Sequence, residues 1–206
     1  MTKKAAIIPI ILAMIFLLSS CAKNRNENVY FIHAVCFEEQ SNGDVGIYAV
    51  SEKQVGDKAE GEKGSRNYEV ISAEGKNHET ATKAFSDKYK NVYFATSEIY
   101  IFKDDSTADF IKTISRSLCD SSVYPVKSSV IITNVDNTED FLGRIKNVDD
   151  VKRLLSLSKK NRVNIVSFFA KINEGKDCYV PIIGTDDSGE LIFIEKRKFG
   201  EGERYE

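Results

Sequence analysis

Cysteine and histidine are the residue types in this 206-residue chain best able to act as nucleophiles, bases or metal ligands, and both are scarce. The chain has four cysteines: Cys21, Cys36, Cys119 and Cys178. None belongs to a CxxC pair, so their spacing does not predict a thiolate zinc site. Cys36 stands in an apolar run, where we expect it to be a small buried hydrophobic residue.

The two histidines do not form a recognisable catalytic or metal-binding pattern. His33 lies inside an apolar stretch typical of a strand, so we expect a structural role for it. His78 precedes a helical pattern, and we expect it to be exposed in the first helical turn, without a second histidine or cysteine at metal spacing. A G-x-S-x-G nucleophile motif is absent. We therefore predict a protein that is not an enzyme and that uses neither a cofactor nor a metal.

Paired acidic and basic residues have simpler structural explanations. The acidic pairs are Asp104-Asp105, Asp149-Asp150 and Asp186-Asp187. Each stands where a helix begins or a turn closes, so capping and turn roles account for them. The basic cluster 159–162 suits a helix C-terminus, and the cluster 196–198 is expected to be a solvated edge.

The first 21 residues have the layout of a secretory signal peptide. Lys3 and Lys4 form a positive start, an uncharged apolar run covers 5–18, and small residues precede Cys21. The run is shorter than the roughly 20 residues of a membrane span. The ending Leu-Ser-Ser-Cys resembles a bacterial lipobox, which implies cleavage before Cys21 and a diacylglycerol on its sulfur. An uncleaved anchor with an incidental cysteine is the alternative.

We expect this leader (1–20) to be followed by a polar tether (21–28) and a single domain (29–206). The full chain has 206 residues and a net charge of −2, and the 20-residue leader contains two lysines and no acidic residue. Its removal leaves 186 residues with a net charge of −4. A mildly acidic body argues against a nucleic-acid-binding protein. If Cys21 carries lipid, the other three cysteines allow at most one disulfide, and the sequence does not say which.

Hydrophobic periodicity predicts strands and helices in alternation. The expected strands are 29–37, 45–50, 68–73, 92–102, 126–133, 179–183 and 190–194. The first expected helix covers 80–89 and is capped by Asn77. The second is capped by Asp105 or Ser106 and buries Phe110, Ile111, Ile114 and Leu118. Three further helices are expected at 136–146, 148–159 and 163–171. Strand–helix–strand order predicts an α/β (mixed α+β) fold, with helices packed on a mixed sheet and strand hairpins at both ends. The segment 54–66 is charged and glycine-rich, and we interpret it as a solvated loop.

The middle of the chain resembles the N-terminal domain of the Ger(x)C spore-germination lipoproteins, the C subunits of germinant receptors. The resemblance lies in the lipoprotein leader, Ile71–Ala81 (ISAEGKNHETA), Phe85, and Val92–Asp105 (VYFATSEIYIFKDD). It continues in Val180-Pro-Ile-Ile183 and in the stretch Gly189–Phe199, and it covers roughly residues 29–200. It implies a first domain alone, held on the outer face of the spore inner membrane, with integral membrane receptor subunits as partners.

Our expectation is therefore a membrane-anchored interaction module in spore germination. The alternative is a lipid-anchored extracytoplasmic protein that binds a small ligand, with a pocket lined by aromatics such as Tyr93, Tyr100 and Phe102. A thiol enzyme or hydrolase is a third possibility, and it would need a Cys–His pair assembled in space.

Overall fold

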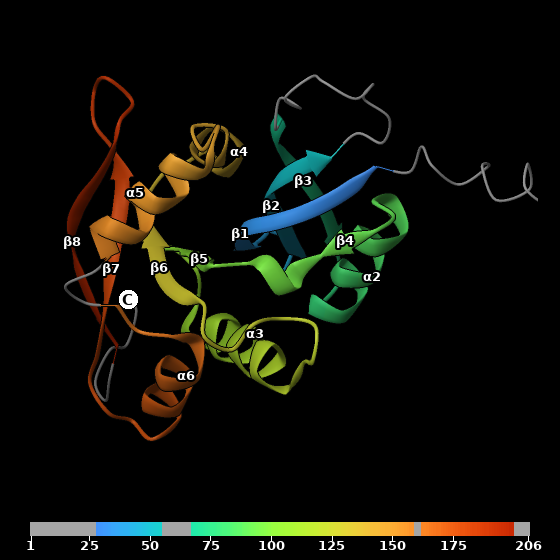
Figure 1. Ribbon diagram of the computed structural model, residues 1–206. Coiled ribbons are helices and arrows are strands. Elements are labelled where there is room, and N and C mark those ends of the chain that lie inside the picture. Colours follow the sequence, from blue (N-terminus) through green and yellow to red (C-terminus); the bar gives the residue numbers. More distant parts are fainter. Residues whose placement is uncertain (1–27, 55–66, 159–161, 200–206) are drawn as a thin grey trace, which may run out of the picture.

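A computed structural model describes residues 28–54, 67–158 and 162–199, in which eight strands form one mixed sheet and five α-helices pack on it (Figure 1). The strands are β1 (Val29–Glu39), β2 (Val45–Gln54), β3 (Asn67–Gly75), β4 (Val92–Tyr93), β5 (Ile99–Lys103), β6 (Ser129–Thr133), β7 (Cys178–Thr185) and β8 (Leu191–Phe199). The helices are α2 (His78–Lys88), the 3₁₀ helix η2 (Phe94–Thr96), α3 (Ala108–Asp120), α4 (Thr138–Leu142), α5 (Val148–Ser158) and α6 (Ile165–Asn173). The predicted α/β class is confirmed. The expected leader and residues 21–27 of the expected tether lie outside the described residues, as does most of the expected loop 54–66.

The sheet has a parallel centre and antiparallel edges, with the order β3-β2-β1-β5-β6-β7-β8 and β4 paired with β1. β1, β5, β6 and β7 run parallel, whereas β2, β3 and β8 are joined to their neighbours as antiparallel hairpin strands. Both predicted terminal hairpins are present. Gly43 (φ +82°) closes the first and Gly189 (φ +80°) the second, because each turn needs a left-handed residue that glycine adopts without steric cost.

The sheet separates between β6 and β7, where the chain crosses from one face to the other. β6 and β7 are paired only at Ile132 and Ile182. At the N-terminal end of β6, the backbone amide of Val130 donates a hydrogen bond to the carbonyl of Val163 (2.9 Å). The amide of Ile165 donates one to the carbonyl of Ser128, just before the strand (3.1 Å). Residues 163–165 therefore take the place of β7 beside the start of β6.

The helices cover the two faces of the sheet as separate layers (Figure 1). α2, α3 and α6 bury Phe85, Ile114 and Phe168 in one core, and α4 and α5 bury Phe141 and Leu154 in the other. The four α3 positions expected to be buried are buried. Successive side chains of the central strands point alternately into the two cores. Both faces of these strands are therefore buried, which is why they are apolar throughout.

The predicted strand 92–102 is wrong as one continuous element. It is broken into β4, η2 and β5, with the break at Phe94–Ser97. The Thr96 hydroxyl donates to the carbonyl of Ile32 (2.8 Å) and to that of Tyr93 (3.0 Å), and the amide of Ser97 donates to Phe94 (2.9 Å). These bonds give the backbone an alternative to the sheet ladder, so β-propensity alone overextends the strand.

Several predicted boundaries also shift. Thr107, rather than Asp105 or Ser106, caps α3, because its hydroxyl accepts from the amide of Phe110 (3.2 Å). The predicted helix 136–146 shortens to α4, capped by Asn137. The strand expected from residue 126 starts at Ser129, the helix expected from 163 starts at Ile165, and β8 runs five residues beyond the expected end at 194.

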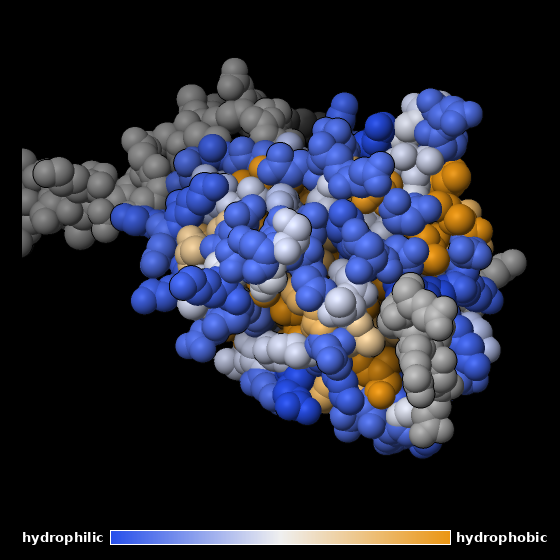
Figure 2. All heavy atoms as spheres, turned by 180° about the vertical axis from the view of Figure 1, so that it is seen from behind, coloured by the Kyte–Doolittle hydropathy of each residue, from blue (hydrophilic) through white to orange (hydrophobic). Residues whose placement is uncertain are grey.

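The surface is largely hydrophilic. Figure 2 shows polar residues over most of the visible face, with hydrophobic atoms gathered on the right, the side of β7 and β8 in this turned view. The large hydrophobic residues that stay exposed include Phe193 and Ile194 on β8.

Candidate functional site

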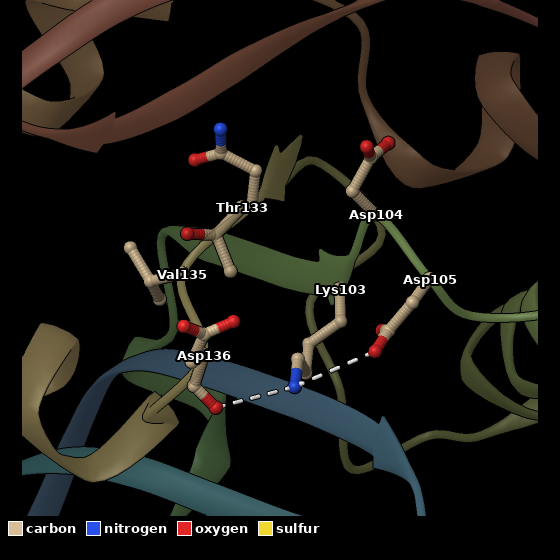
Figure 3. A pocket seen from close by; sticks show the side chains of 7 residues that line it. Lys103, Asp104, Asp105, Thr133, Val135 and Asp136 are labelled. Carbon is tan, nitrogen blue, oxygen red and sulfur yellow. Dashed lines mark hydrogen bonds and ion pairs between the residues drawn. The ribbon is translucent and has the colours of Figure 1, made fainter.

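A polar pocket of about 220 Å³ lies at the carboxyl ends of the parallel strands β5 and β6 (Figure 3). The residues that line it are Lys103, Asp104, Asp105, Thr133, Asn134, Val135 and Asp136. Lys103 is the last residue of β5 and Thr133 is the last residue of β6. The two are register partners, so they lie side by side at the pocket. The carboxyl edge of parallel strands is where α/β folds place their ligand sites.

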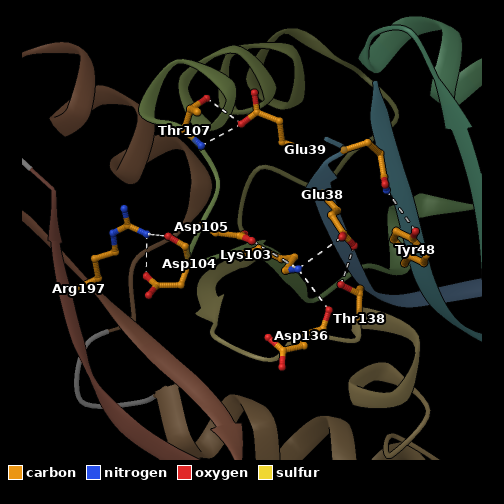
Figure 4. Close-up of polar contacts among 11 residues, drawn as sticks. Glu38, Glu39, Tyr48, Lys103, Asp104, Asp105, Thr107, Asp136, Thr138 and Arg197 are labelled. Atoms are coloured by element: carbon orange, nitrogen blue, oxygen red, sulfur yellow. Dashed lines mark hydrogen bonds and ion pairs between the residues drawn. The ribbon is translucent and has the colours of Figure 1, made fainter. Parts of the chain in front are cut away.

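Lys103 is the central cation of this pocket and is almost enclosed, with 12% of its side chain exposed. Its ammonium lies 3.5 Å from a carboxylate oxygen of Glu38 and 3.7 Å from one of Asp105. It also donates to the backbone carbonyl of Asp136 at 3.4 Å (Figures 3 and 4). A buried ammonium needs such partners because its desolvation is otherwise costly.

Two glutamates at the end of β1 connect the neighbouring helices to this edge of the sheet (Figure 4). Glu38 accepts a hydrogen bond from the hydroxyl of Thr138 at the start of α4 (2.8 Å). Glu39 accepts from both the amide and the hydroxyl of Thr107, the cap of α3 (2.9 and 2.8 Å). Charge-assisted bonds of this kind hold the starts of both helices beside the pocket.

Arg197 from β8 closes the other side of the pocket through Asp104. One guanidinium nitrogen donates to the Asp104 carboxylate at 2.7 Å and also to the Asp104 backbone carbonyl (Figure 4). Only 9% of the Arg197 side chain is exposed. The expectation of a solvated basic edge is therefore wrong for Arg197. Asp104-Asp105 lies in a turn, as expected, but neither residue caps a helix, and they pair with Arg197 and Lys103.

Thr133 carries an unsatisfied polar group at this site. The residue is fully buried, and its hydroxyl has no hydrogen-bond partner among the described residues. A buried hydroxyl without a partner costs stability. The lining and adjacent residues contain five carboxylates (Glu38, Glu39, Asp104, Asp105 and Asp136) and two cations (Lys103 and Arg197). The arrangement favours a small polar ligand with a positive group.

The described residues contain no group of three or more His, Cys, Asp or Glu side chains placed to hold a metal ion. The other acidic pairs have local structural roles. Asp150 accepts from the backbone amide of Lys146 (2.9 Å), and Asp149 lies 3.1 Å from Lys152. Asp186 accepts three hydrogen bonds within the β7–β8 turn, and those bonds hold its pKa below the usual value.

His33 occupies a structural position in β1. It stands at a register irregularity between Ile32 and Ala34, where its Nε2 lies 3.3 Å from the carboxylate of Glu52. Its ring stacks on Tyr68 with centroids 5.2 Å apart.

His78 is not exposed as expected. Its ring packs against Phe37 and Tyr124 at centroid distances of 5.6 and 5.8 Å, and its Nε2 is buried without a partner among the described residues. Burial lowers the pKa of His78 to about 4. The ring therefore stays neutral and acts as part of an aromatic cluster.

Cys36, Cys119 and Cys178 are all free thiols in the structure. Cys36 is fully buried, as expected, and burial raises its pKa well above the ordinary value. Burial also raises the pKa values of Cys119 and Cys178. A raised pKa disfavours the thiolate, which is the reactive form of cysteine.

The aromatic residues expected to line a ligand pocket do not line one together. Tyr100 and Phe102 are fully buried in the core, whereas Tyr93 is 50% exposed. The pocket at the ends of β5 and β6 is polar instead, and the sequence reasoning missed Thr133, Asn134 and Asp136 in its lining and Glu38 and Glu39 beside it. A usable signal existed, because parallel strands end on the same edge and polar residues follow both β5 and β6.

The geometry defines a mixed α/β domain with a polar pocket at the carboxyl edge of its parallel strands. Comparisons with protein-family models, with curated proteins and with solved structures find no match for this chain. Within the part of the chain that the structure describes, no helix has both the length and the apolar character needed to cross a membrane.

Proposed function

We propose that this protein is a lipid-anchored interaction module on the outer face of the cytoplasmic membrane. The observation that carries the proposal is the leader, in which a charged start, a short apolar run and small residues precede Cys21. Two acyl chains hold a protein stably on a membrane, whereas one does not. The resemblance to the first domain of Ger(x)C proteins supports spore germination as the process, the spore inner membrane as the location and integral receptor subunits as partners.

Lipidation tests the first half of the proposal. Cells that express the full chain are fed an alkyne-labelled fatty acid, and the label is detected on the purified protein. The wild type and a Cys119→Ser control should both carry label, and Cys21→Ser should carry none. Label that persists in the Cys21→Ser variant would exclude this cysteine as the anchor.

Spores test the second half. Spores that lack the gene should germinate slowly with at least one germinant, and the wild-type gene should restore the rate whereas Cys21→Ser should not. The wild-type chain should also co-purify with integral receptor subunits from spore inner membranes. Normal germination of the deleted strain with every germinant would reject the germination proposal and leave the anchor standing.

Small-ligand binding is a second candidate, favoured by the polar pocket at the carboxyl ends of β5 and β6, where Lys103 and three aspartates line the space. A ligand that binds the folded state raises the melting temperature by mass action. A panel of amines, amino acids and amino sugars should contain a compound that stabilises the wild type but stabilises Asp136→Asn, a change at an exposed residue of the pocket lining, much less. The absence of any stabilising compound in the panel counts against this candidate.

A further inference from the structure

The proposed anchor restricts which end of the domain can face the membrane. Seven residues, 22–28, connect Cys21 to the start of β1. However they are arranged, seven residues span at most about 25 Å. A folded domain of this size is about 40 Å across. The lipid therefore keeps the start of β1 nearer to the bilayer than most of the surface.

Aromatic rings gather at that end of β1. Phe31 and Tyr93 are register partners in β1 and β4, and their rings stack with centroids 5.5 Å apart. Tyr93 is 50% exposed, although tyrosine is large and partly apolar. On the opposite face of β1, Tyr30 and Tyr89 meet edge to face at 5.6 Å and are partly buried against the core. Amphipathic aromatic rings favour the headgroup level of membranes, where one end is apolar and the other hydrated.

Lysines accompany these rings. The ammonium of Lys88 lies 5.1 Å from the centroid of the Tyr89 ring, and that of Lys53 lies 5.8 Å from the Tyr30 centroid. Lys90 is exposed in the short connection between α2 and β4. Lysine stems cover apolar surface while the ammonium reaches headgroup phosphates. Lys53 also lies 3.8 Å from the carboxylate of Glu69, and the Lys88 ammonium donates to the backbone carbonyl of Ser72 (2.9 Å). Because both lysines have partners within the domain, the aromatic rings are the main basis of the inference.

We propose that this group forms a membrane-contact rim, which lies in the headgroup layer of the bilayer that holds Cys21. The rim consists of Tyr30, Phe31, Lys53, Lys88, Tyr89, Lys90 and Tyr93. The inference rests on the proposed lipid anchor and adds the orientation of the domain. The short tether keeps the rim near the lipid surface, and its rings and lysines match the chemistry of that surface.

The sequence offers a direct test because it contains no tryptophan. Tyr93→Trp and Phe193→Trp each introduce a single fluorescent reporter. Phe193 is a matched control, since it is also an exposed aromatic residue (39%), but it lies on β8 at the edge of the sheet, with β5, β6 and β7 between it and β1. The full-length lipoprotein is reconstituted in phosphatidylcholine–phosphatidylglycerol vesicles whose acyl chains are brominated near the headgroups.

The Y93W emission should be quenched roughly twofold by brominated lipid and shifted to shorter wavelength, as for an indole at the membrane interface. The F193W emission should be unchanged. Unquenched Y93W protein that still floats with the vesicles would overturn the rim and leave the anchor intact. Protein that does not float with vesicles would refute the anchor, and the rim with it.

Reversing the charge of one lysine tests whether the lysines of the rim contribute to the contact with anionic lipid. In the Y93W background, Lys90→Glu should weaken quenching by anionic vesicles, whereas Lys146→Glu, an exposed lysine between α4 and α5, should not. Equal losses from the two reversals would contradict a contact at the rim, because they would report the net charge alone.

Discussion

The neutral, buried state of His78 predicts a specific loss of stability in weak acid. His78 is the first residue of α2, and its ring packs on Phe37 and Tyr124. Its buried Nε2 has no hydrogen-bond partner among the described residues. Burial lowers its pKa from 6.5 to about 4. Protonation would also place a positive charge at a helix N-terminus, where the helix dipole opposes it.

The sign and size of the effect follow from proton linkage. The unfolded chain protonates His78 near pH 6.5, whereas the folded protein does so near pH 4. Between these values the unfolded state binds more protons, so the free energy of unfolding falls as the pH falls. A pKa difference of this size corresponds to a loss of at most about 3 kcal/mol at 1.36 kcal/mol per unit.

Urea unfolding followed by circular dichroism at several pH values from 7 to 4 measures this loss. His78→Phe keeps an aromatic ring in the cluster and removes the titrating group. The difference in unfolding free energy between wild type and H78F should therefore depend on pH, with a slope that approaches about 1.4 kcal/mol per pH unit. His33→Gln removes the other histidine of the chain, and the pH-dependent loss of unfolding free energy that His78 causes should remain in this variant.

A difference between wild type and H78F that does not vary with pH would refute this reasoning. An imidazole pKa near 6.5, measured for His78 by NMR in the folded protein, would refute it independently. Either result would mean that the ring is solvated in solution.

Three further substitutions or treatments test other parts of the fold. Gly75→Ala should destabilise the protein by several kcal/mol in urea unfolding, because a Cβ there would clash with the backbone nitrogen of Ala81. At Gly43 an added Cβ meets no atom within 4 Å, so Gly43→Ala should cost only about 1 kcal/mol for its left-handed backbone. Thr133→Val should be neutral or stabilising by about 1 kcal/mol in the same assay, since it removes a buried hydroxyl without a partner. In native protein, a maleimide reagent should modify Cys36 only after urea is added, as counted by mass spectrometry, because that thiol is fully buried.

The parts of the fold that depend on local chemistry were predictable from sequence. The sequence predicts Asn77 as a helix cap, and in the structure its side chain and that of Thr80 form a reciprocal capping box at the start of α2. The turn around Gly43 and the buried face of α3 were predictable for the same reason. Each is decided by residues within a few positions of one another.

The parts that depend on distant contacts were not predictable. The hydroxyl that interrupts the strand 92–102 bonds to a carbonyl 64 positions away, and Arg197 meets Asp104 across 93 positions. The sequence predicts His78 in the first turn of a helix, where it lies, but the aromatic residues that bury it come from β1 and from the loop before β6. Pattern alone could not bring these segments together.

β1 connects the two features that the proposals concern. Its first residues carry the proposed rim, and its last two, Glu38 and Glu39, border the polar pocket. A strand of 11 residues extends about 33 Å at 3.3 Å per residue. With the start of β1 in the headgroup layer, the pocket lies at the far end of that strand, and with β1 along the membrane normal it faces away from the bilayer. A soluble ligand would reach that pocket from outside, whereas a membrane-embedded receptor subunit would have to contact the domain nearer to the rim. Substitutions in the pocket and in the rim should consequently affect different partners.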